Sequence, residues 1–266
     1  MQERLDASVR RQILIEDQAW IGKPVDISGA NPRAVQANVR HMALMLMDTA
    51  VKDRASRAAA FAEHLIDATM AQHVTQPVAC AKGCSHCCTT YVSSTVPEVF
   101  NLARAVQGNA GAIMRIVKAS ARSRAMPQLQ REVDRVVCPI LEDHACSAYA
   151  NRPVVCRAVL STSLDSCLRI FTQGIGEPFK YPDNLGPVRA FMTVMVRGAL
   201  FLSGLPHQNI ELTHALEVAL TTTHAEERWL AGEPIFAGVA LDRGEQNPSS
   251  IMGLVNALAN AVRPTL

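Results

Sequence analysis

Apolar residues recur at helical spacing over much of the chain, which predicts a series of amphipathic helices. Asn31-Pro32 has the form of a helix start, because an N-cap residue is followed by a first-turn proline. Two helices are predicted between there and residue 74. Their inner stripes are Val35, Val39, Met42 and Leu46 for the first, and Ala58, Phe61, Leu65 and Ala68 for the second.

Helical spacing returns after residue 95. Thr95-Val-Pro-Glu98 is a capping box, which predicts a helix that starts there and stops near Gly108. The segment Thr89–Thr95 is rich in β-branched residues and predicts a short extended stretch before that helix. Further helices are predicted over residues 110–124, 163–171, 188–202, 210–220 and 250–262.

The pattern divides the chain into four regions of one domain. Residues 1–30 show no sustained period and predict a surface arm, and residues 31–79 hold the first helices. Residues 80–170 are rich in cysteine, and their part from 138 to 157 is expected to be irregular because two prolines interrupt it. Residues 171–266 are again helical. The expected fold class is mainly α, a single helical domain around this central cysteine-rich segment.

Composition and charge narrow the range of possible functions. With 266 residues, 48% of them hydrophobic, the chain can bury a core without help from a metal. A formal net charge of +2 with no run of like charge predicts no nucleic-acid partner and no membrane-binding patch. The first residues carry charges of both signs and no apolar run follows them, so a cytoplasmic protein is expected. The apolar stretch 190–205 is short and contains Arg197, so no membrane span is expected.

Cysteine is the residue type that carries the chemistry. All eight cysteines fall in the central third of the chain, at Cys80, Cys84, Cys87, Cys88, Cys138, Cys146, Cys156 and Cys167. In a chain without an export signal, thiols at this density predict a metal site rather than disulfides. All eight are therefore candidate metal ligands.

The spacing of the cysteines leaves the number of metal centres open. Cys84-x2-Cys87 can deliver two thiolates from a single turn, but the adjacent Cys87 and Cys88 point in different directions. Either two centres draw on both cysteine runs, or one centre leaves some thiols for packing or redox chemistry. Cys167 lies at helical spacing among apolar residues, so a plain core role is its alternative.

Charged and imidazole side chains next to the cysteines are further candidates. Thiolates around a metal leave a net negative charge, and Lys82, Arg152 and Arg157 are placed in the sequence to neutralise it or to donate hydrogen bonds to sulfur. His86 and His144 each lie within two residues of a cysteine and are alternative ligands.

Three stretches carry a resemblance to a known family: Cys80–Cys88, then Cys138-Pro-Ile-Leu141, then Cys146-Ser-Ala-Tyr-Ala-Asn-Arg-Pro-Val-Val-Cys-Arg157. Together they resemble the YkgJ-type cysteine-cluster family, also called CxxCxxCC, whose pattern runs Cys-Pro-Phe-Leu and Cys-x-Ile-Tyr-x-x-Arg-Pro-x-x-Cys-Arg. Ile140 and Ala148 depart from it, and the first gap has three residues instead of two. The resemblance covers residues 80–170 and implies the binding of zinc or iron, with no common reaction.

Two enzymatic readings accompany the resemblance. A flagellin lysine methylase looks like a relative with a similar cluster, which keeps a metalloenzyme acting on a peptide or protein substrate open. Cys80-x3-Cys84-x2-Cys87 also has the spacing of radical S-adenosylmethionine enzymes. That class is built on repeated βα units, which this chain does not show, and five further cysteines would have no role.

The sequence favours an iron–sulfur protein with a redox or modification-supporting role, because eight cysteines exceed what one structural zinc needs. The alternative is a zinc module that fixes a surface for a protein or peptide partner, whose identity the sequence does not give. No catalytic residue is identified, since the adjacent Glu142 and Asp143 are expected to be solvated.

Overall fold

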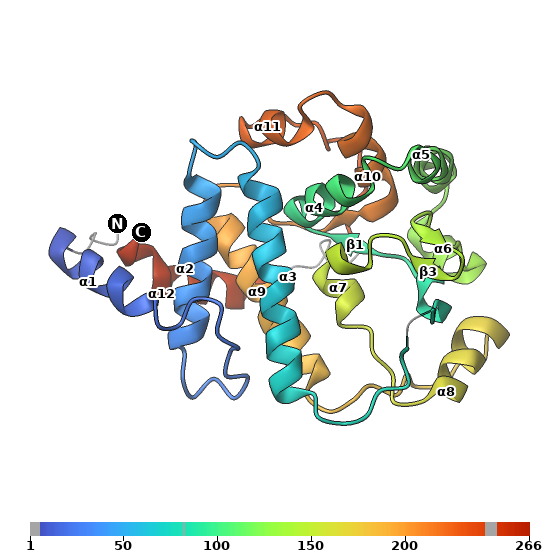
Figure 1. Cartoon of the computed structure of the whole chain (residues 1–266), viewed down its shortest axis with the longest axis horizontal. Coiled ribbons are helices and arrows are strands. Elements are labelled where there is room, and N and C mark those ends of the chain that lie inside the picture. Colours follow the sequence, from blue (N-terminus) through green and yellow to red (C-terminus); the bar gives the residue numbers. More distant parts are fainter. Residues whose placement is uncertain (1–5, 82, 243–248) are drawn as a thin grey trace.

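The structure is a computed structural model that describes residues 6–81, 83–242 and 249–266 (Figure 1). Helices make up 59% of it and strands 4%, so the expected mainly α fold class is confirmed. The helices are α1 Ala7–Asp17, α2 Arg33–Met47, α3 Arg54–His73, α4 Val96–Val106, α5 Ala110–Arg124, α6 Gln128–Asp134, α7 Val154–Arg157, α8 Leu164–Leu168, α9 Leu185–Leu202, α10 Leu212–Thr221, α11 Ala225–Leu230 and α12 Ser249–Val262.

Strands and shorter helical turns complete the described fold. The strands are β1 Ser93–Ser94, β2 Leu141–Glu142, β3 Ala145–Cys146 and β4 Ile210–Glu211. Two antiparallel pairs result, β1 with β4 and β2 with β3. The short turns include the 3₁₀ turns η1 His86–Thr89, η2 Tyr149–Asn151 and η5 Arg263–Thr265, and the π turn η3 Arg169–Gln173.

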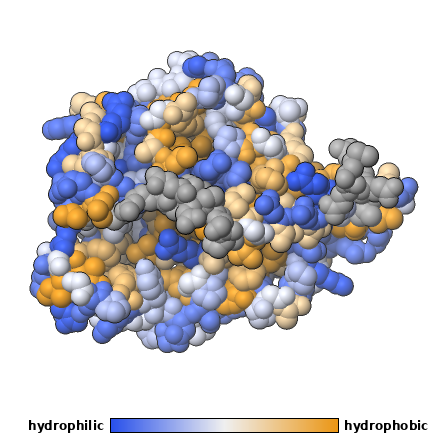
Figure 2. Space-filling view, turned by 180° about the vertical axis from the view of Figure 1, so that it is seen from behind, coloured by the Kyte–Doolittle hydropathy of each residue, from blue (hydrophilic) through white to orange (hydrophobic). Residues whose placement is uncertain are grey.

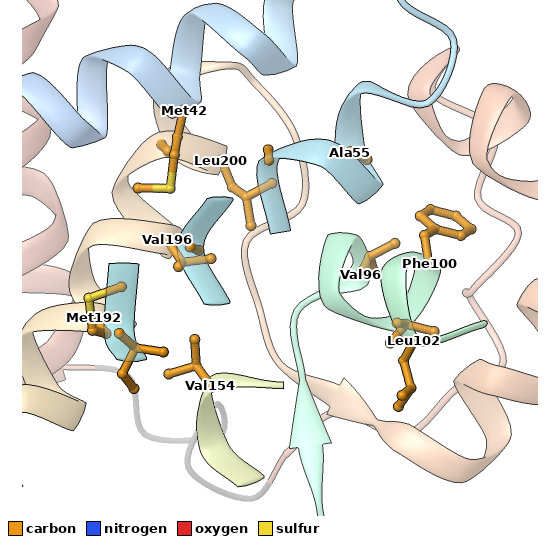
Figure 3. Close-up of a cluster of buried hydrophobic side chains, with 14 of the residues drawn as sticks. Met42, Ala55, Val96, Phe100, Leu102, Val154, Met192, Val196 and Leu200 are labelled. Atoms are coloured by element: carbon orange, nitrogen blue, oxygen red, sulfur yellow. The ribbon is translucent and has the colours of Figure 1, made fainter. Parts of the chain in front are cut away.

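Two packed groups of helices form the body of the protein. Helices α2, α3 and α9 pack against one another, and α12 packs on α2 and α9. On the other side of α3, α4 packs between α3 and α10, and α10 packs on α5 (Figure 1). The shared core contains Met42 of α2, Met192, Val196 and Leu200 of α9, Val154 of α7, and Val96, Phe100 and Leu102 of α4 (Figure 3).

Helix α9 is central to this core. Within the described part of the chain it alone is long and apolar enough to cross a membrane, yet half of it is buried inside the fold. Its Met192 and Met195 are fully buried against neighbouring helices. On the face shown in Figure 2, hydrophobic side chains form patches between hydrophilic ones.

The helices with clear apolar stripes lie where the sequence predicts them. The capping box is present, since Glu98 accepts hydrogen bonds from the Thr95 N–H and hydroxyl at 3.0 and 2.6 Å. Its other carboxylate oxygen accepts the N–H of Val154 at 2.7 Å, which attaches the start of α7 to the start of α4. The cysteine segment is thereby fixed to the helical core through a buried glutamate.

Four helices are not predicted by the pattern. Helix α1 buries no side chain, and α6, α7 and α11 are short, so none of them shows a sustained apolar stripe. The N-terminal region nevertheless reaches the core, because Val25 is 0% exposed and Asp17 pairs with the buried Arg40. The predicted extended stretch Thr89–Thr95 contains a strand of only two residues.

Candidate metal centre

Residues 138–157 are more regular than the sequence suggests. Strands β2 and β3 form a tight hairpin, with Leu141 opposite Cys146, and the two residues that join them, Asp143 and His144, have φ of 47° and 61°. Positive φ at both loop residues is the geometry of a type I′ turn. The expectation of an irregular loop is wrong here, because Asp-His lacks the glycine that usually marks such a turn.

Hydrogen bonds between distant segments bring the cysteine runs together. The N–H of Cys138 donates to the carbonyl of Cys88 at 2.8 Å. Below α7 in Figure 1, the segments after α3 and after α7 run side by side, and the N–H of Ala79 donates to the carbonyl of Ser161 at 2.7 Å. The residues between α3 and α4 are therefore held against those on either side of α7.

Six cysteines line one cavity of about 700 Å³: Cys84, Cys87, Cys88, Cys138, Cys146 and Cys156. They come from three separate stretches of the chain: Cys84–Cys88, which leads into and includes the start of η1; Cys138 and Cys146, just before and within the β2–β3 hairpin; and helix α7. The expectation that the two cysteine runs converge in space is confirmed.

The surroundings of four of these thiols, Cys87, Cys138, Cys146 and Cys156, favour the protonated form in the absence of a cation. The pKa of Cys87 is raised by a hydrogen bond with Cys88 and then by burial. Burial raises the pKa of Cys138 to about 11, and it also raises the pKa of Cys146 and Cys156. A metal ion reverses this preference, because thiolates that bind it are stabilised by its charge.

Cys80 and Cys167 lie beside the cavity and do not line it. The Sγ of Cys80 accepts the N–H of Ser161 at 3.4 Å, and Cys167 is buried in α8. The pKa of Cys80 is raised first by burial and then by the neighbouring Cys84, Cys87 and Cys167. Cys84 and Cys87 thus stand between the cavity and a second group of thiols.

The chemistry of the donor set, which consists of thiols, fits a thiophilic metal. Seven of the cysteines are partly exposed, all eight have free thiols, and six face one space. Within the described residues, no three His, Cys, Asp or Glu side chains are already close enough together to hold an ion. Which thiols bind a metal stays a prediction.

The predicted histidines and the adjacent carboxylates lie outside the cavity wall. His86 and His144 do not line it, and His144 is exposed at the hairpin turn. Glu142 is exposed and pairs with Arg115 at 3.5 Å, and Asp143 is exposed in the turn, as expected for solvated carboxylates. Lys82 lies outside the described residues.

The two arginines that the sequence places next to the cysteines have different surroundings. Arg152 lines the cavity, and its guanidinium lies 3.6 Å from the ring centroid of Tyr149. Its charge lowers the pKa of Cys87, Cys146 and Cys156 against the effects that raise them. Arg152 is therefore placed to balance the charge of metal-bound thiolates.

Arg157 instead points into the helical core and does not line the cavity. Its guanidinium pairs with Glu63 at 3.3 Å and with Asp67, both on α3, and its Nε donates to the carbonyl of Arg152 at 2.6 Å. Because these carboxylates already balance its charge, the geometry gives Arg157 a structural role in place of the expected contact with sulfur.

Glu63 predicts a measurable pH dependence of stability. Burial raises the pKa of Glu63 from 4.5 to about 7. The charge of Glu98 adds to this effect, and a hydrogen bond from Asn101 opposes it. Between these values the folded state holds a proton that the unfolded state has released, so the free energy of unfolding falls as pH rises from 4.5 to 7. The loss is expected to be about 3 kcal/mol.

Urea unfolding of wild type and Glu63→Gln between pH 4.5 and 8 tests this expectation. The variant should lose most of that slope, because a neutral amide does not titrate. Glu227→Gln is the control, because Glu227 is exposed and its pKa is lowered by Lys52, so it titrates below this pH range. Equal slopes in wild type and Glu63→Gln would contradict the prediction.

Comparison with known proteins adds one finding. No curated protein and no solved structure matches the chain. Residues 79–173, just over a third of the chain, match a family model, and this matched stretch contains all eight cysteines of the chain. That family is CxxCxxCC, described as "Putative zinc- or iron-chelating domain", so the resemblance seen in the sequence is confirmed and metal binding is supported for this segment.

Proposed function

We propose that the chain binds an iron–sulfur centre through cysteines of the cavity and supports a redox or modification reaction. The observation that carries this proposal is the convergence of six cysteines, from three stretches of the chain, on one cavity of about 700 Å³. An iron–sulfur centre bound there would supply electron transfer or substrate activation.

The number of converging thiols favours iron over zinc. A structural zinc uses four ligands and is usually found where a small core needs support. Here six thiols face the cavity and two more adjoin it, while the helical core is extensive. An iron–sulfur centre accounts for more of these cysteines. It also gives the metal a chemical role, because the helical core does not need a metal for its stability.

Arg152 supports the same proposal. An iron–sulfur centre with cysteine ligands is anionic, and a nearby cation favours its more negative, reduced state. Arg152 faces the cysteines and forms no ion pair with a described carboxylate, so its charge is available for this purpose. A cytoplasmic location, where thiols remain reduced, belongs to the proposal as well.

The decisive experiment is purification of the whole chain without oxygen, followed by iron, zinc and sulfide analysis and a visible spectrum. Iron and acid-labile sulfide in fixed ratio, with visible absorbance, are expected. Stoichiometric zinc without sulfide or colour would reject the iron proposal and favour a zinc module for contact with a protein or peptide. Absence of any bound metal would reject both.

A further inference from the structure

The cavity is lined by much more than cysteine. Its volume of about 700 Å³ lies within the ordinary range of small-molecule sites, about 300 to 1,000 Å³. Most of the remaining wall is apolar, and five aromatic side chains contribute to it: Tyr91, Tyr149, Phe171, Phe179 and Tyr181. A wall of this composition is typical of a site for an organic ligand.

Three of these aromatics form a continuous shelf. The ring centroids of Phe171 and Phe179 are 5.6 Å apart, and those of Phe179 and Tyr181 are 4.5 Å apart. Phe171 belongs to η3, and the other two lie in the segment between η3 and α9. Tyr181 is 51% exposed, so the shelf keeps aromatic surface that a planar or apolar ligand can cover.

Charged groups of the wall fall into two kinds. Arg131 is neutralised by Glu211 at 2.7 Å, and Glu177 is neutralised by Arg169 at 3.0 Å. These pairs are satisfied within the protein and contribute little net charge to the cavity.

The remaining two charges are both positive. Arg152 and Arg189 line the cavity, and neither forms an ion pair with a carboxylate among the described residues. Arg152 lies close enough to the cysteines to lower the pKa of Cys156, so its charge serves the thiolates. Arg189, in the first half of α9, is exposed, so its guanidinium is available to pair with an anionic group of a ligand.

We infer that this cavity binds a small organic anion with an aromatic or otherwise apolar body, whose acidic group meets Arg189 and whose body covers the Phe171–Phe179–Tyr181 shelf. Arginine suits a carboxylate or phosphate because its planar fork donates two parallel hydrogen bonds. The inference deepens the proposed function, since the ligand would lie beside the metal centre as a substrate or cofactor.

Two soluble probes that differ by one charge test the inference. Indole-3-acetate carries a carboxylate on an aromatic body, and indole-3-acetamide is its neutral counterpart. Calorimetry on the anaerobically purified whole chain should show one site that prefers the anion. Arg189→Gln should weaken indole-3-acetate about tenfold and leave indole-3-acetamide unchanged, whereas Tyr181→Ala should weaken both.

The control is Arg122→Gln, which removes an exposed arginine of α5 that does not line the cavity and should change neither affinity. No binding of indole-3-acetate, equal binding of both probes, or an unaltered Arg189→Gln would overturn the inference. Metal and sulfide analysis of the same samples separates the two proposals. Iron without anion binding rejects the inference alone, and anion binding without iron rejects the iron–sulfur proposal alone.

Discussion

Replacing Cys156 by serine is expected to remove most of the bound metal while the flanking helices stay folded. Cys156 lines the cavity from α7, where burial and then the charges of Cys138, Cys146 and Cys87 raise its pKa. A serine hydroxyl is a poor ligand for zinc or iron compared with a thiolate. The variant therefore lacks a candidate ligand that the other cavity thiols surround.

The helices should survive because their stability comes from elsewhere. Helices α2, α3 and α9 bury their stripes against one another and include no cysteine. The helical circular dichroism signal should therefore change little, while cleavage by protease within residues 138–157 should become faster. Metal content, circular dichroism and limited proteolysis measure the three effects.

Cys167→Ser is the matched control for this prediction. Cys167 is buried in α8 and does not line the cavity, although it lies near Cys80. Its replacement should retain the metal of a centre built on the cavity cysteines. Equal metal loss in both variants would show that the second group of thiols binds metal too, and full retention in Cys156→Ser would contradict the prediction.

The helical part of the fold could be predicted because its local signals agree with its packing. Val35, Val39, Met42 and Leu46 recur at turn spacing and all lie in the buried face of α2, and Thr95-x-x-Glu98 makes its expected hydrogen bonds. Helix α1 could not be predicted, since it buries nothing and its position depends on contacts such as Arg40 with Asp17.

The candidate site could be predicted only in part. Cysteine is distinctive in a sequence, so the convergence of the two runs could be expected from their ligand chemistry. Arg189 and Tyr181 have no such signature, because only the fold brings the start of α9 and the segment before it to the cavity. Arg152 and Arg157 look alike in sequence, and only the fold directs one to the thiols and the other to α3.

Arg157→Gln is expected to lower the free energy of unfolding by about 3 to 5 kcal/mol. The side chain of Arg157 is 6% exposed and joins the segment that carries Cys156 to helix α3. Its loss leaves Glu63 buried with one hydrogen bond from Asn101, and it removes donors to the carbonyls of Ala150 and Arg152. A shorter amide cannot reach these acceptors together, and unpaired buried groups are costly.

Arg152→Gln provides the matched control, because it removes a neighbouring arginine without a carboxylate partner and should cost less than about 1 kcal/mol. In urea unfolding at pH 7, the double variant Arg157→Met/Glu63→Leu should recover part of the loss, since it removes both buried charges. If Arg157→Gln instead unfolds like Arg152→Gln, then the pairs with Glu63 and Asp67 do not attach the cysteine segment to the core.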